Sequence, residues 1–238
     1  MRARVWGLLV LGLVVPLAIR ADDKADDPGK AALQALNDFV GTWNGTGGPD
    51  KPRPDPKDPV WKETISWSWR FKGRDAWLTF DVKDGKYLTN GELRYSPEKK
   101  VYALTATDVR KQKLEFEGKL DAKGYLTLER TDRGTGEVQQ LVMNSAGDGV
   151  RFVYRYATKP KGKTVFTKVY QVAASKEGES LGKADKKNEC VVTGGLGTMP
   201  VTYMGETYYV CCTGCRDAFN EEPAKFVKAY KEKKAKNP

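Results

Sequence analysis

The stretch Thr64-Ile65-Ser66-Trp67-Ser68-Trp69-Arg70-Phe71 alternates polar and apolar side chains without a break. Its large apolar residues therefore lie on one face of an extended chain, and its hydroxyl and charged residues lie on the other. A period of two predicts a β-strand with one face in a hydrophobic core. This stretch decides the fold class, because the same alternation recurs along most of the chain.

The alternation returns in Phe152–Tyr156, where the aromatic residues share a face, and in Val165–Tyr170. Turn signals separate the runs at Asp84-Gly85, Ser96-Pro97, 122–124, 147–149 and 160–162. We count roughly nine or ten strands joined by short loops, a number that usually closes into a barrel because closure removes exposed edges. The sequence predicts a mainly β protein with an antiparallel up-and-down barrel over residues 32–175. One long, proline-rich loop, 47–59, is expected at an end of this barrel.

Residues Phe39-Val40-Gly41-Thr42-Trp43, at the start of the first expected strand, resemble the Gly-x-Trp entry of lipocalin-like barrels. The resemblance implies an interior that holds an apolar small molecule. The alternative is that the tryptophans fill the core themselves, as buried aromatic residues usually do. The tryptophans concerned are Trp43, Trp67, Trp69 and Trp77.

The N-terminus has the pattern of a secretory signal peptide. A basic start, Met1–Arg4, precedes the apolar run Val5–Ala18, and Ala21 offers a cleavage point. The apolar run is shorter than the ~20 residues that span a bilayer, so an uncleaved anchor is the second interpretation. We predict cleavage after residue 21, export to the periplasm or the extracellular space, and no stable membrane span afterwards. Residues 22–31 are expected to be disordered.

Composition restricts the function. The chain contains no histidine, which removes the commonest general base and the commonest neutral metal ligand. We therefore expect a protein that is not an enzyme. The net charge of +10, or +7 without Arg2, Arg4 and Arg20, includes a C-terminal lysine run at helical spacing. A solvated helix face explains that run more simply than nucleic-acid binding, and no nucleic-acid partner is expected.

All four cysteines lie near the C-terminus, after a polar stretch, 176–188, that is typical of a linker. They are Cys190, Cys211, Cys212 and Cys215. Two short β runs hinged at Gly205 predict a hairpin, and helices are expected to begin near Arg216 and at 221–223. The hairpin folds the chain back, so the early cysteine and the later ones can converge on one ion. Thiolates near a helix N-terminus favour zinc or copper(I) over hard ions.

The segment 189–238 resembles a YHS domain, a metal-binding module related to TRASH domains. The resemblance rests on Glu189–Gly194, Tyr203–Cys211, Gly214–Phe219 and Glu222–Phe226. It implies a treble-clef-like fold in which Cys190, Cys211 and Cys215 are metal ligands. Cys212 is additional to the family pattern, and we expect it to be the fourth ligand. Tyr208-Tyr209 stands where the family has its histidine, which leaves the metal and the number of ligands open.

Three alternatives remain for the cysteines and for the chain. The four thiols can instead form two structural disulfides, as in many exported modules. Cys212-Thr213-Gly214-Cys215 is also a C-x-x-C at a strand-to-helix corner, the arrangement of a thiol-disulfide oxidoreductase. The third alternative is a barrel that carries an apolar ligand, with a merely structural cysteine module. The preferred hypothesis is an exported protein that captures, buffers or delivers a soft or borderline metal ion.

Overall fold

The computed structural model describes residues 28–53, 55–147, 149–178 and 188–236. The expected signal peptide, 1–21, lies outside these residues. So do residues 22–27 of the segment expected to be disordered and 179–187 of the expected linker. Export and the linker remain predictions.

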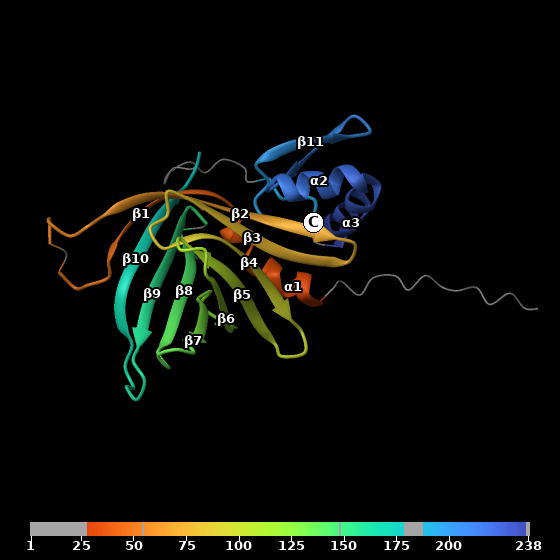
Figure 1. The fold of residues 1–238 in the computed structure, drawn as a ribbon. Helices are drawn as coiled ribbons and strands as arrows, with labels where there is room; N and C mark the ends of the chain where they lie inside the picture. Colours follow the sequence, from red (N-terminus) through yellow and green to blue (C-terminus); the bar gives the residue numbers. More distant parts are fainter. Residues whose placement is uncertain (1–27, 54, 148, 179–187, 237–238) are drawn as a thin grey trace, which may run out of the picture.

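Ten antiparallel strands close into an up-and-down barrel, which confirms the predicted fold class (Figure 1). Each strand pairs with its neighbours in the sequence, and β1 completes the barrel by pairing with both β2 and β10. The strands are β1 (Gly41–Pro49), β2 (Trp61–Lys72), β3 (Asp75–Lys83), β4 (Leu88–Ser96), β5 (Val101–Asp108), β6 (Lys113–Leu120), β7 (Leu126–Thr131), β8 (Val138–Ala146), β9 (Arg151–Lys159) and β10 (Thr167–Lys176).

The alternation of side chains determines which face of each strand lies inside the barrel. In β2, Ile65, Trp67 and Trp69 are buried, while the serines between them are only partly covered. Trp77 was expected as a possible core residue, but it lies in the outward phase of β3, between the buried Ala76 and Leu78. Trp77 therefore lies on the outer surface of the barrel. There the Arg94 side chain partly covers it, with the guanidinium 4.1 Å from the centre of the indole ring.

Side chains fill the middle of the barrel. The Phe152 ring lies 5.0 Å from the ring centre of Phe39, 5.6 Å from Trp43 and 6.3 Å from Trp67. The cavity between Phe152, Trp67 and their neighbours has a volume of only about 20 Å³. That volume suits at most one water molecule. The tryptophans Trp43, Trp67 and Trp69 therefore fill the core, and this part of the barrel has no room for an apolar ligand.

A short N-terminal segment covers one end of the barrel. It consists of α1 (Pro28–Gln34) and the 3-10 helix η1 (Asn37–Phe39), and we call it the plug. The Phe39 ring enters the aromatic core, and the Tyr102 hydroxyl donates a hydrogen bond of 2.8 Å to the Ala32 carbonyl. Helix α1 begins at Pro28, inside the segment expected to be disordered, because its buried residues Gly29 and Leu33 pack on the barrel.

Two strand boundaries differ from the sequence-based expectation. Strand β1 continues to Pro49, where it still pairs with β10, so the loop to β2 covers only residues 50–60. Strand β10 begins at Thr167 rather than at Val165, whose side chain is 74% exposed. A bulge between Lys168 and Tyr170 then changes the phase of this strand, so that Tyr170 faces the interior. Alternation alone does not reveal such a bulge.

We expect Phe152→Ala to lower the free energy of unfolding by about 3–5 kcal/mol, because it removes a buried ring at the centre of the aromatic cluster. Denaturation by guanidinium chloride, followed by tryptophan fluorescence, measures this change. The control is Tyr125→Ala, which truncates an aromatic side chain that is 38% exposed. An equal, small effect of both variants would contradict the assignment of Phe152 to the core.

The C-terminal residues form a hairpin and two helices beside the plugged end of the barrel (Figure 1). The elements are β11 (Met199–Tyr203), β12 (Glu206–Val210), α2 (Thr213–Glu221) and α3 (Pro223–Lys236), as the sequence predicted. Helix α2 packs on β2, and the Lys30 ammonium of α1 lies 6.0 Å from the centre of the Phe226 ring in α3. The module and the barrel therefore share one continuous hydrophobic core.

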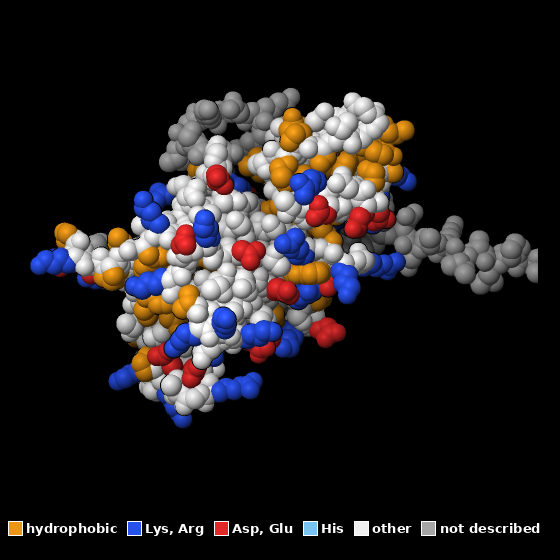
Figure 2. Space-filling view, turned by 45° about the horizontal axis from the view of Figure 1, so that its top comes forward, with side chains coloured by type: hydrophobic (Ala, Val, Ile, Leu, Met, Phe, Trp, Pro, Cys, Tyr) orange, Lys and Arg blue, Asp and Glu red, His pale blue; other side chains and the backbone are white. Residues whose placement is uncertain are grey.

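The lysines of α3 take part in ion pairs within the module. Lys231 lies 2.9 Å from Glu206, and Lys233 and Lys234 both contact Glu189. Figure 2 shows basic and acidic side chains interspersed over the barrel, with apolar side chains gathered over the C-terminal module. Among the described residues, no helix has the length and apolar character needed to cross a membrane.

Candidate metal centre

Cys190 begins a tight loop, and the end of this loop at Gly194 and Gly195 lies back beside Cys190. The Cys190 N–H donates to the Gly195 carbonyl at 2.7 Å, and the Gly194 N–H donates to the Cys190 carbonyl at 2.8 Å. Gly194 makes this return possible because its φ of +77° is a conformation that favours glycine. A parallel bridge to Tyr209 then places Cys190 beside the end of β12. The loop thus carries its cysteine to the strand that leads to the other three.

The other cysteines lie where β12 passes into α2. Cys211 follows the last residue of β12, Cys212 is the N-cap residue of α2, and Cys215 lies in the first turn of that helix. Cys212 has an extended backbone, with φ −161° and ψ 171°. Since neighbouring side chains of an extended chain point to opposite sides, Cys211 and Cys212 face different surroundings.

Three of the four thiols form one compact group. The Sγ atoms of Cys190, Cys211 and Cys215 all lie within 4.8 Å of one another, and those of Cys211 and Cys215 are 3.4 Å apart. All three side chains are buried, and all four cysteines are free thiols. Zinc–sulfur bonds of about 2.3 Å require neighbouring sulfurs to lie about 4 Å apart. The spacing of this group fits a single thiolate-bound ion.

Cys212 lies beside this group rather than within it. Its Sγ is 3.9 Å from the Cys211 Sγ, and it accepts a hydrogen bond of 3.4 Å from the backbone N–H of Trp69 in the barrel. The three-cysteine group that can hold an ion does not include it. The cysteines that could hold an ion together are thus Cys190, Cys211 and Cys215, while Cys212 also contacts the backbone of β2.

Burial and mutual hydrogen bonding shape the acidity of the cluster. Hydrogen bonding with Cys211 and Cys215 lowers the pKa of Cys190 and that of Cys212. Hydrogen bonding to Cys190 raises the pKa of Cys211, and burial raises that of Cys215. These shifts favour a proton on Cys211 and on Cys215 when no metal is bound. A bound cation would displace such protons, so acidification is expected to weaken metal binding.

A hydrogen-bonded chain connects the thiol group to the plug and the barrel. The Thr193 hydroxyl lies 3.6 Å from the Cys211 Sγ, and the Thr193 carbonyl accepts hydrogen bonds from Gln34 at 3.1 Å and from Asn37 at 2.9 Å. The side-chain amide oxygen of Asn37, Oδ1, in turn accepts a hydrogen bond of 3.1 Å from the Trp69 indole N–H. Side chains outside the cysteine group therefore fix the loop that carries Cys190.

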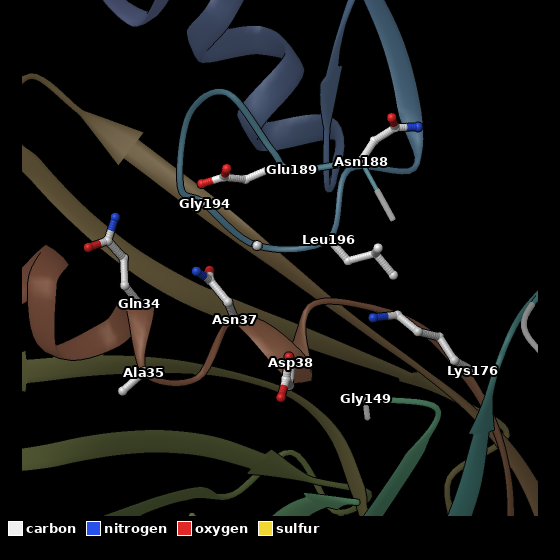
Figure 3. A pocket seen from close by; sticks show the side chains of 11 residues that line it. Gln34, Ala35, Asn37, Asp38, Gly149, Lys176, Asn188, Glu189, Gly194 and Leu196 are labelled. Atoms are coloured by element: carbon white, nitrogen blue, oxygen red, sulfur yellow. The ribbon is translucent and has the colours of Figure 1, made fainter. Parts of the chain in front are cut away.

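A polar cleft of about 460 Å³ separates the plug from the loop after Cys190 (Figure 3). Gln34, Asn37 and Asp38 lie on one side, and Glu189 and Gly194 lie on the other. None of the residues that line this cleft is a cysteine. The cleft thus ends at the outer face of the loop and does not expose the thiols.

No protein-family model matches the chain, and a search of curated proteins finds no similar sequence.

Sequence reasoning identified all four cysteines but missed the residues around them. Thr193 carried a weak signal, because it lies three residues after Cys190, in the segment Glu189–Gly194 that resembles a YHS domain. Trp69 and Asn37 carried none, since they lie more than a hundred residues earlier in the chain and were assigned only to the barrel domain, 32–175. Their contribution depends on how the module packs on the barrel.

Proposed function

We propose that the C-terminal module holds one soft or borderline metal ion, zinc or copper(I), through the thiolates of Cys190, Cys211 and Cys215. The observation that carries this proposal is the grouping of three buried Sγ atoms within 4.8 Å of one another. Burying three thiols in contact stabilises little by itself, whereas thiolates around one ion are a strong interaction. The resemblance of 189–238 to YHS domains supports the same ligand set.

The proposed site is suited to retaining its ion. The exposed fractions of Cys190, Cys211 and Cys215 are 1%, 6% and 0%. Loop 190–196 is held by the plug, and α2 is held by β2. An ion in this position leaves only when these contacts open, so we propose capture or storage of the metal as the primary role. Together with the predicted signal peptide, this implies a metal-binding protein of the periplasm or extracellular space that is not an enzyme.

Quantitative metal analysis of the reduced protein tests the proposal. After incubation with zinc or with copper(I), followed by desalting, we expect about one ion per chain. Removal of the metal by a chelator at neutral pH should be slow in the native protein and fast under partial denaturation. A reduced protein with four titratable thiols and no retained metal of either kind would refute the proposed function.

The Cys212→Ser variant is expected to retain about one ion per chain, because the proposed ligand group does not include Cys212. The serine oxygen lies on a shorter bond than the sulfur, so a weaker hydrogen bond from the Trp69 N–H should instead lower the free energy of unfolding by about 1 kcal/mol. Metal analysis and chemical denaturation of the same preparation measure the two effects. A variant that loses its metal would make Cys212 a ligand.

A further inference from the structure

The barrel is closed in its middle but open at the end opposite the plug. A cavity of about 460 Å³ lies at this end, among the starts of β4, β6 and β8 and the ends of β5, β7 and β9. Its volume lies within the range of small-molecule pockets, which is roughly 300–1,000 Å³. The filled core below it limits its depth, since only about 20 Å³ is free among the aromatic side chains there. Any ligand must therefore be compact.

Stacked tyrosines form one side of the cavity. The Tyr170 ring lies between those of Tyr87, at 4.0 Å and an angle of 5°, and Tyr156, at 5.2 Å and 21°. The Trp61 ring packs edge-on against both Tyr87 and Tyr170. These contacts hold the rings in place, so the aromatic surface exists before any ligand arrives.

Two of these tyrosines offer unused hydrogen-bond donors. Within the described part of the chain, no hydrogen bond joins the hydroxyl of Tyr156 or Tyr170 to another residue, and both residues line the cavity. Tyr154, deeper in the barrel, differs because its hydroxyl donates to the buried Glu63 at 2.7 Å. Burial raises the pKa of Tyr156 to about 12 and that of Tyr170 well above its usual value. Both phenols therefore remain neutral donors at ordinary pH.

Arg130 supplies a positive charge that faces inward from the end of β7. Its guanidinium lies 5.9 Å from the centre of the Phe116 ring, donates to the Gln139 side chain and approaches Asp132 at 3.5 Å. The side chain is only 17% exposed. Its position is thus fixed on two sides, and the charge is partly shielded from water.

The two carboxylates that line the cavity are already engaged by their own turns. Asp108 accepts backbone N–H bonds of 2.8 Å from Arg110 and Gln112. Asp132 accepts the backbone N–H of Thr135 at 2.9 Å and that of Gly134 at 3.0 Å. Backbone donors stabilise both negative charges locally. The cavity keeps an excess of donors, because Lys113 and Arg110 line it together with Arg130 and the two phenols. Arg110 pairs with Asp108 and is 78% exposed, whereas Arg130 is the more buried guanidinium.

We propose that this cavity binds a compact organic anion with an apolar body, such as an aromatic carboxylate. Arg130 and the phenols of Tyr156 and Tyr170 bind the anionic group, and the tyrosine stack with Phe116 and Leu141 contacts the apolar body. A charge-assisted hydrogen bond in a partly buried site favours the anion over a neutral analogue of the same shape. The cavity lies at the far end of the barrel from the cysteines, so this site is independent of the metal centre.

The test uses the full chain and the fluorescent probe 1-anilinonaphthalene-8-sulfonate, displaced by 2-naphthoate or by its neutral analogue 2-naphthalenemethanol. We expect saturable binding of about one probe per chain, and displacement at least tenfold more effective with 2-naphthoate than with the alcohol. Dodecanoate should compete less well than 2-naphthoate, because its chain has no room to extend into the core. Arg130→Gln should weaken probe binding about tenfold or more. Arg130→Lys should restore part of it.

The matched control is Arg94→Gln, which removes a guanidinium from the outer face of the barrel. It should leave probe binding unchanged, and circular dichroism checks that every variant is folded. Absence of saturable binding, equal displacement by the acid and the alcohol, or equal binding by the Arg130→Gln and Arg94→Gln variants would each overturn the proposal. Stronger competition by dodecanoate would overturn the compact-ligand assignment.

Discussion

The Cys190→Ser variant of the reduced protein is expected to lose its metal ion. Cys190 is the single ligand supplied by the loop before the hairpin, and its Sγ lies within 4.8 Å of both other ligands. Replacing a partner outside the first coordination sphere commonly costs 10–100-fold in affinity, so loss of a thiolate ligand should cost more than about 100-fold. Competition with a chromogenic chelator measures the affinity.

A second measurement on this variant separates lost binding from a misfolded module. Metal at 100 times the dissociation constant should stabilise the wild-type chain by about 2.7 kcal/mol. Thermal unfolding should therefore shift upward on metal addition in the wild type and in Cys212→Ser, but not in Cys190→Ser. Equal shifts in all three chains would mean that Cys190 is not a ligand.

The second large effect is expected at Gly214, where α2 meets the barrel. A Cβ atom at this position would lie 1.8 Å from the carbonyl oxygen of Trp69 and 2.8 Å from its carbonyl carbon. Both are backbone atoms of β2, so no side-chain rotation relieves the overlap. Gly214→Ala must push α2 away from the barrel and lengthen the bond from the Trp69 N–H to the Cys212 Sγ.

We expect Gly214→Ala to lower the free energy of unfolding by about 3 kcal/mol and to weaken metal binding. The direction of the change in stability distinguishes packing from helix propensity. In a helix without tertiary contacts, alanine is more favourable than glycine by about 1 kcal/mol, so propensity alone would make Gly214→Ala more stable. Thr213→Ala is the matched control, since Thr213 is the exposed preceding residue of the same helix. Denaturation curves decide between the two outcomes, and an unchanged or higher stability of Gly214→Ala would contradict the packing of α2 on β2.

The barrel could be predicted because each of its strands is indicated by the residues of that strand and of the adjacent turns. Alternation in β2 and β9, with a turn signal at each corner, indicates strands independently of what they pack against. The hairpin and helices around the cysteines were predictable for the same reason. The bulge before Tyr170 was not, since it depends on the pairing partner rather than on the strand itself.

The candidate site was only half predictable. Four cysteines close in sequence indicate a local thiol site, but they do not reveal which of two adjacent side chains points inward. Cys211 and Cys212 differ because the chain is extended between them and the barrel lies on one side. The module packs on the barrel at Gly214, where a side chain would overlap the backbone of β2. A glycine in a sequence does not show whether its role is a turn, a helix end or a close contact, so this packing could not be predicted.

X-ray absorption spectroscopy of the metal-loaded protein tests the central claim most directly, because it counts the sulfur atoms bound to the ion. We predict three sulfur neighbours at about 2.3 Å for the zinc form, with the same number in Cys212→Ser and fewer in Cys190→Ser. A count of four that falls to three in Cys212→Ser would contradict the three-thiolate centre. So would a first shell composed of nitrogen and oxygen alone.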